Sequence, residues 1–197
     1  MIDLNGYEDV SPSLPGEFPR LPADGYICRV VNVELTTSKS DKPMLVLFVD
    51  IAEGNFAGFF KNAVDRIKSF NYAFKWDSSA TYRQLVFGND GLTSRFFKGL
   101  LSCFELSNPY LKFNPHAFDE KILRGCLIGF VFAEEEYFKQ NGTIGTRTFI
   151  KFPKSVADIR NRNFKVPDFK ELPPDAQKPP AKSFYDQEAF DPNDIPF

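Results

Sequence analysis

The sequence predicts a mainly β fold with one helix among the strands and a disordered tail. Three observations predict it. Five runs of residues have the apolar content or alternation of strands, and only one segment has a clear helical period. The residues after 165 combine many prolines and charges with few aliphatic side chains, which favours disorder. We therefore divide the 197 residues into one domain, 1–165, and an acidic, Pro-rich tail, 166–197.

The first two strands are predicted to form a hairpin after an irregular, Pro-rich arm. Residues 25–37 alternate in hydropathy, but the apolar face changes near Val30 and Val31, which indicates a bulge. Residues 44–52 are almost continuously apolar, as in a core strand. Residues 81–87 are predicted to be a short third strand, whereas the chain before them has no clear period.

A single amphipathic helix is expected over 93–106. Its apolar residues recur at helical spacing, Thr93 or Ser94 can cap its start, and Pro109 follows its end. Gly99 lies in its middle and costs about 1 kcal/mol relative to alanine. Either a close packing contact needs this glycine or the helix is locally weak.

The last strands form a second predicted hairpin. Residues 123–133 are strongly apolar and continue outward to Lys139, Asn141-Gly142 is a strong turn signal, and residues 143–152 return. The predicted order is three strands, a helix and two strands. This is the order of a five-stranded OB-fold barrel with one helix between strands 3 and 4. Other small mixed β folds share this order.

Charge is sorted along the chain although the formal net charge is only −2. The tail carries seven acidic residues and three lysines, so its net charge is −4 and that of the body is +2. Residues 139–165 hold seven basic residues and one acid, with phenylalanines between them. A second stretch, 58–83, mixes basic and aromatic residues in the same way.

This mixture predicts a surface for single-stranded nucleic acid. Basic side chains attract phosphates, and neighbouring aromatic rings stack on bases without reading their sequence. A solvated charged face and a Phe-rich core, with 23 Phe in the chain, are the plainer alternatives. The predicted DNA-binding residues are Phe59, Phe60, Lys61, Arg66, Lys75, Trp76, Tyr82, Arg83, Tyr137, Arg147, Phe149 and Lys151.

The sequence contains few residues suited to catalysis, a cofactor or a metal site. His116 is the only histidine, and no P-loop, G-x-G-x-x-G or G-x-S-x-G motif is present. We therefore predict a protein that is not an enzyme and has no cofactor or metal. The alternative that is hardest to exclude is a magnesium nuclease, because carboxylates need no fixed spacing. Its candidate ligands are Asp50, Glu53, Glu134 and Glu136.

Cysteine usage and hydropathy predict a cytoplasmic protein. Cys28, Cys103 and Cys126 are odd in number and far apart, as expected for thiols in a reducing compartment. The N-terminus has no apolar core of a signal peptide, and no run of about 18 apolar residues could span a membrane.

The last residues of the chain, DPNDIPF, resemble the C-terminal tip of bacterial single-stranded DNA-binding proteins. The resemblance implies a docking peptide for replication, repair and recombination proteins, in which the terminal ring and carboxylate are captured together. The implied partner-binding residues are Asp191, Asp194, Ile195, Pro196 and Phe197. Pro192 and Asn193 stand where acids are more common in that family.

The body is similar to phage-encoded single-stranded DNA-binding proteins of Gram-positive hosts. The similar stretches are FFKGLLSCFELSNP (96–109), GFVFAEEEY (129–137) and NFKVPDFKEL (163–172). The resemblance implies an OB fold, non-specific binding to single-stranded DNA and a place in the host cytoplasm. A phage adaptor, or a recombination mediator or annealing protein, acting mainly through its tail is the alternative. The sequence leaves homo-oligomerisation and the choice between DNA and RNA open.

Overall fold

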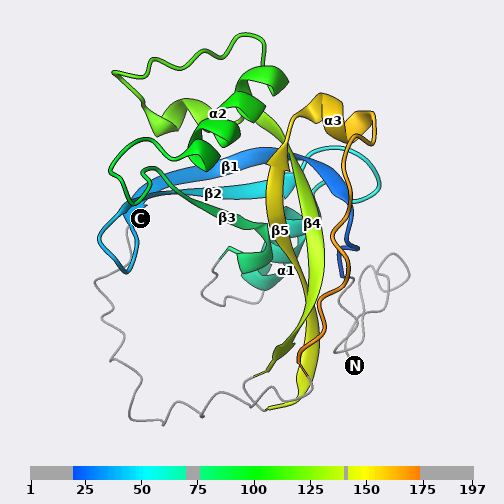
Figure 1. Cartoon of the computed structure of the whole chain (residues 1–197). Coiled ribbons are helices and arrows are strands. Elements are labelled where there is room, and N and C mark those ends of the chain that lie inside the picture. The colour runs from blue at the N-terminus through cyan, green and yellow to red at the C-terminus, as the bar shows by residue number, and fades with distance from the viewer. Residues whose placement is uncertain (1–19, 70–75, 140–141, 174–197) are drawn as a thin grey trace.

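The computed structural model describes residues 20–69, 76–139 and 142–173 (Figure 1). Its strands are β1 (Gly25–Thr37), β2 (Pro43–Ile51), β3 (Thr81–Leu85), β4 (Leu127–Phe138) and β5 (Ile144–Lys154). Its α-helices are α1 (Phe59–Ser69), α2 (Arg95–Ser107) and α3 (Val156–Arg160), and its 3₁₀ helices are η2 (Ser78–Ala80) and η3 (Glu120–Leu123). No described helix is long and apolar enough to cross a membrane.

The five strands form one antiparallel sheet of order β3-β2-β1-β4-β5. The mainly β prediction and the position of the helix between the third and fourth strands are confirmed. The bulge expected in the first strand is present, because the β1–β2 register shifts between Val30 and Asn32. This shift lets one long strand present apolar side chains to both faces of the sheet.

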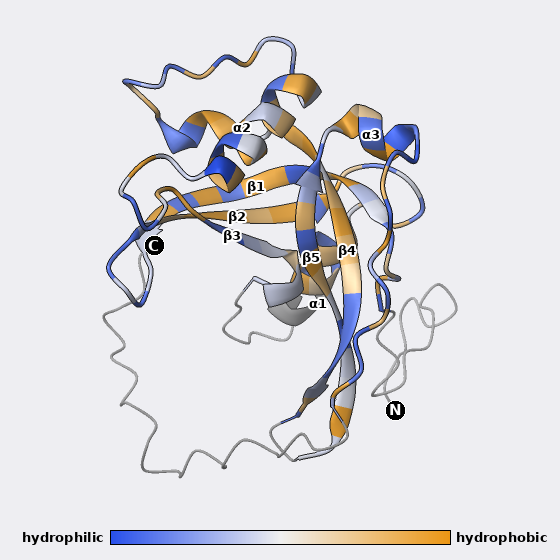
Figure 2. Cartoon of the chain, in the orientation of Figure 1, coloured by the Kyte–Doolittle hydropathy of each residue, from blue (hydrophilic) through white to orange (hydrophobic). Residues whose placement is uncertain are grey.

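The sheet curves around one main core. Buried side chains from β1, β2, β4 and β5 and from α1 and α2 belong to the same cluster, with Leu45, Phe104 and Phe130 fully buried. The two edges of the sheet also approach each other, since η2, directly before β3, packs against β5. Figure 2 shows that the sheet is hydrophobic beneath α2, whereas the outer half of the β4–β5 hairpin is largely hydrophilic.

Helix α2 lies where the sequence predicts a helix. Ser94 caps it by accepting a hydrogen bond from the Phe96 amide, and Phe97, Leu100 and Phe104 face the core. At its end the buried Asn108 side chain donates to the Leu127 carbonyl at 2.8 Å and accepts from the Leu127 amide at 3.0 Å. Asn108 therefore joins the end of α2 to the start of β4.

Helix α1 is an element that the sequence analysis did not predict. Its start is held by Asp50 of β2, whose carboxylate accepts the Phe60 amide at 3.0 Å. The cap thus comes from ten residues away, so no capping residue next to the helix marks its beginning. The helical spacing of Phe60, Ala63 and Val64 was the available signal.

Helix α3 and Phe164 cover one end of the outer face of the sheet, which is the face opposite the main core. Val156 and Ile159 of α3 pack on Val131 and Ile27 in a second, smaller cluster. Gly129 is required beneath α3, because a Cβ there would lie 2.8 Å from the Ser155 carbonyl oxygen.

The segment after α3 continues along β4, and this changes the predicted start of the tail. Lys170 forms a parallel bridge with Glu135, in which its amide donates to the Glu134 carbonyl and its carbonyl accepts the Glu136 amide. Residues 166–173 therefore belong to the folded body rather than to a disordered tail from 166. The composition of residues 166–173 did not indicate that they are ordered, because backbone hydrogen bonding to an unpaired strand edge needs no aliphatic side chains.

Candidate nucleic-acid interface

The register of the β4–β5 hairpin brings three predicted binding residues together, and a fourth, Lys151, lies next to them at a register shift. Residues directly across an antiparallel pair share one face of the sheet. The pairs Glu135–Arg147 and Ala133–Phe149, with Tyr137 across from Gly145, therefore form one row. We call Tyr137, Arg147, Phe149 and Lys151 the hairpin row.

Cations and rings alternate along the hairpin row. The Arg147 guanidinium carbon lies 5.4 Å from the centre of the Tyr137 ring and 5.9 Å from that of Phe149. The Lys151 ammonium lies 5.7 Å from the centre of the Phe149 ring. Arg147 and Lys151 are exposed, and both rings are half-buried. Such cation–π contacts hold charge and aromatic surface side by side.

Gly145 gives the Tyr137 ring its place in the row. A Cβ at position 145 would lie 3.2 Å from Cε1 of Tyr137 and 2.5 Å from Cε of Lys139. A glycine across the strand pair therefore lets the ring lie close to the backbone of β5.

Each acid of the run Glu134-Glu135-Glu136 in β4 binds a different segment of the chain. Glu134 pairs with Arg20 at 3.3 Å, and Glu135 accepts the Arg147 Nε at 2.8 Å. Glu136 accepts the Leu172 amide at 2.9 Å. The three acids thus fix the segment before β1, the central cation of the hairpin row and the segment after α3.

Several basic residues of 139–165 have acidic partners from elsewhere in the chain. Arg160 pairs with Glu53 and Arg162 with Asp24, each at 2.8 Å, and Lys165 lies 3.8 Å from Asp168. Lys151, by contrast, forms no ion pair with any described residue. The local net charge of +6 is therefore largely compensated by acids from outside this segment. Lys151, in the hairpin row, is a cation that keeps its charge uncompensated among the described residues.

Three of the predicted aromatic residues in 58–83, Phe60, Trp76 and Tyr82, are turned toward the core, which corrects part of the prediction. Phe60 is 2% exposed, and Trp76 is half-buried against the main cluster. Tyr82 faces inward with its ring centre 5.1 Å from that of Phe130, and burial raises its pKa to about 12. These three rings are parts of the core, so they do not form an open stacking surface.

The two remaining predicted cations of this region whose side chains are described lie on different elements. Lys61 on α1 is exposed and pairs with Asp65 at 3.1 Å, and Arg83 is exposed on the face of β3 away from Tyr82. The side chain of Arg66, and all of Lys75, lie outside the described residues. The five residues predicted in the C-terminal tip lie outside them too.

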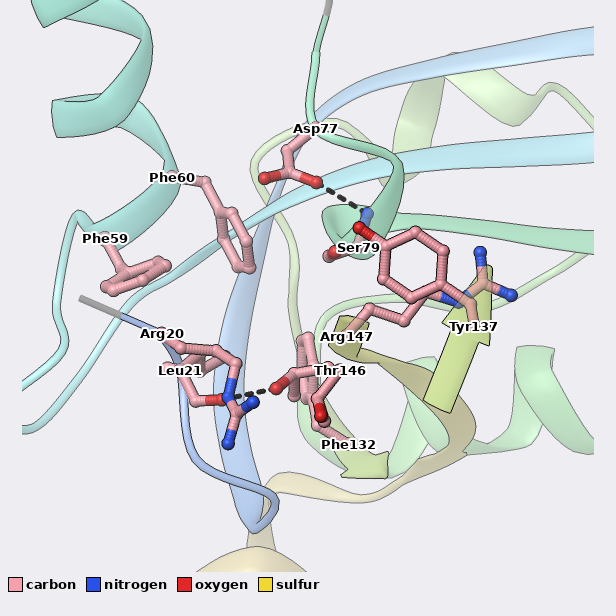
Figure 3. A pocket seen from close by; sticks show the side chains of 11 residues that line it. Arg20, Leu21, Phe59, Phe60, Asp77, Ser79, Phe132, Tyr137, Thr146 and Arg147 are labelled. Atoms are coloured by element: carbon pink, nitrogen blue, oxygen red, sulfur yellow. Dashed lines mark hydrogen bonds between the residues drawn. The ribbon is translucent and has the colours of Figure 1, made fainter. Parts of the chain in front are cut away.

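A cleft opens between α1, η2 and the β4–β5 hairpin, with a volume of about 440 Å³. Figure 3 shows Phe59 and Phe60 on one side, Tyr137 and Arg147 on the other, and Asp77 and Ser79 between them. Sequence reasoning did not find the other lining residues, because they come from separate segments. They are Arg20, Leu21, Asp77, Ser79, Phe132, Thr146 and Thr148.

The four carboxylates considered for a magnesium site are engaged separately. Asp50 accepts backbone amides, Glu53 pairs with Arg160, and Glu134 and Glu136 hold the two segments described above. Across residues 20–69, 76–139 and 142–173, no three His, Cys, Asp or Glu side chains are grouped so that they could hold a metal ion.

Comparison with known proteins assigns no family to this arrangement. No protein-family model matches the chain, and no curated protein matches it.

Proposed function

We propose that this protein binds single-stranded DNA without sequence specificity, through an OB-type barrel, and recruits partner proteins with its C-terminal tip. The observation that carries the proposal is the hairpin row. Its alternating rings and cations are the groups that stack on bases and attract phosphates. Because rings stack on any base, such a row binds a strand regardless of its sequence.

The sheet supports the OB-type barrel. In that fold, strand 1 pairs with strands 2 and 4, strand 5 pairs with strand 4, and a helix lies between strands 3 and 4. The observed order β3-β2-β1-β4-β5 and the position of α2 agree with this plan. The contact between η2 and β5 brings together the two edges that would close the barrel.

The test is a titration of the full chain with labelled oligo-dT at several salt concentrations. We expect binding that weakens steeply with salt and that greatly exceeds binding to duplex DNA of the same length. Absence of binding at low salt would contradict the proposal. The protein would then be better interpreted as an adaptor that acts through its tail.

The tip has a separate role in the proposal, as the docking peptide implied by Ile195-Pro196-Phe197. Deleting these three residues should abolish capture of replication or recombination proteins from the host. The same deletion should leave affinity for oligo-dT unchanged or raised. Loss of DNA affinity on deletion would contradict this division of roles.

A further inference from the structure

We propose that the cleft between α1, η2 and the β4–β5 hairpin receives one base of the bound strand. The inference rests on the proposed function and adds to it a specific site for the base. The volume of about 440 Å³ lies within the range of about 300–1,000 Å³ that is typical of small-molecule sites.

The walls of the cleft suit a flat heterocycle with a polar edge. The half-buried rings of Phe59 and Tyr137 are the aromatic surfaces of the cleft that a ligand can reach, and the buried rings of Phe60 and Phe132 lie at its floor. Asp77, which caps η2, and Ser79 within η2 provide polar groups nearby (Figure 3). Aromatic and apolar contact with the faces of a base, and hydrogen bonds to its edge, are how proteins hold bases removed from a stack.

Asp77 is compatible with all four bases. Its Oδ1 accepts the Ser79 amide at 2.8 Å, so the carboxylate is held in place at the N-terminus of η2. Each base offers at least one N–H donor on its Watson–Crick edge, and a carboxylate only accepts. The site therefore requires no particular base, in agreement with non-specific binding.

The charges of the cleft favour a base over a phosphate. Its two cations, Arg20 and Arg147, are paired with Glu134 and Glu135. Asp77 adds a further carboxylate, which would repel a phosphate group. The phosphates of the strand are expected outside the cleft, beside Lys151, which is exposed and has no described acidic partner.

The cleft is continuous with the hairpin row. Tyr137 and Arg147 line the cleft and also form one end of the row. A strand that follows the row therefore reaches the mouth of the cleft at Tyr137, where one base can turn inward. Both arginines are held by glutamates before DNA arrives, which lowers the entropy lost on binding.

The experiment is photocrosslinking of the full chain to oligo-dT that carries 5-iododeoxyuridine, followed by mass spectrometry of the linked peptides. We expect a crosslink to the peptide that contains Phe59, which lines the cleft and is not part of the hairpin row. The variant Thr146→Trp fills the cleft and should remove this crosslink. It should also weaken binding about tenfold, the effect of losing one stacked base.

The matched control is Ile144→Trp. Ile144 is 55% exposed, lies on the same face of β5 two residues from Thr146, and does not line the cleft. It should keep both the Phe59 crosslink and the affinity. If Thr146→Trp does not fold, Ser79→Phe fills the cleft from η2 and should give the same two losses.

The outcomes separate this inference from the proposed function. Binding with crosslinks only to the peptide of Phe149, unaffected by a filled cleft, would overturn the inference and leave the proposed function standing. Absence of oligo-dT binding by the unmodified chain would overturn both.

Discussion

The β4–β5 hairpin and residues 58–83 have similar compositions but different roles in the fold. Both mix aromatic and basic residues. In the hairpin, Tyr137 and Phe149 lie half-exposed beside cations, whereas Phe60 and Tyr82 point into the core. The difference teaches that local composition does not identify a binding surface. The side of the sheet on which a residue lies decides its role.

Packing explains why the two regions diverge. The hairpin extends beyond β1, and among the described residues the cluster beneath α3 does not reach the hairpin row. The described rings of 58–83, by contrast, lie in or against the main core: Phe60 is buried in it, and Phe59, Trp76 and Tyr82 are partly buried against it. Phe60 and Tyr82 therefore stabilise the core, whereas Tyr137 and Phe149 keep part of their rings exposed beside cations.

The largest expected effect is on the free energy of unfolding, from a change at Phe60 in the core. Replacing Phe60 by alanine should lower the free energy of unfolding by about 3–5 kcal/mol, because it leaves a cavity among buried rings. Urea denaturation followed by circular dichroism measures the change. A Phe60→Ala variant that unfolds at the same urea concentration as the unmodified chain would contradict the core role of Phe60 and remove the contrast between the regions.

The next effect concerns affinity rather than stability. Phe149→Ala should weaken binding to oligo-dT by about 1–3 kcal/mol, the contribution of one stacked ring. The matched control is Phe96→Ala on α2. The Phe96 ring is 64% exposed, and the Arg95 guanidinium carbon lies 5.1 Å from its centre, but Phe96 belongs to neither of the two regions. Equal losses in the two variants would show that any exposed ring beside a cation contributes.

A smaller effect is expected when the Tyr137 ring is displaced. Gly145→Ala should shift the Tyr137 ring by a few tenths of an ångström, because the new Cβ would lie 3.2 Å from its Cε1 atom, and should weaken DNA binding by at most about 1 kcal/mol. Gly99→Ala is its control, because a Cβ at 99 meets no atom within 4 Å. The control should raise the free energy of unfolding by about 1 kcal/mol without changing DNA affinity. Unchanged binding by Gly145→Ala would show that DNA affinity does not depend on the close approach of the Tyr137 ring to β5.

The smallest effect appears in the dependence of binding on salt. Lys151→Met should reduce the slope of log affinity against log salt by about 0.7, the value for one phosphate contact with a single strand. Lys61→Met, which removes a lysine already paired with Asp65, should leave the slope unchanged. The reverse result would move the phosphate path from the hairpin to α1.

The sequence alone determined the elements whose signals are local. Alternation or continuous apolar content identified the strands, and Ser94 with the following apolar period identified α2. The hairpin row could be predicted because Arg147, Phe149 and Lys151 recur every second residue in a strand next to a clear turn. Helix α1 was missed because its cap, Asp50, comes from β2.

Only the tertiary structure decided which charges and rings remain available. The acids that neutralise Arg160 and Arg162 lie more than 100 residues away in the chain, so no count along the sequence can include them. The inward position of Tyr82 follows from the register of β3 on β2. The cleft is built from five separate segments, and its shape exists only once the curved sheet brings η2 against β5. Local periodicity fixes which residues share a face, whereas long-range packing fixes which face is covered.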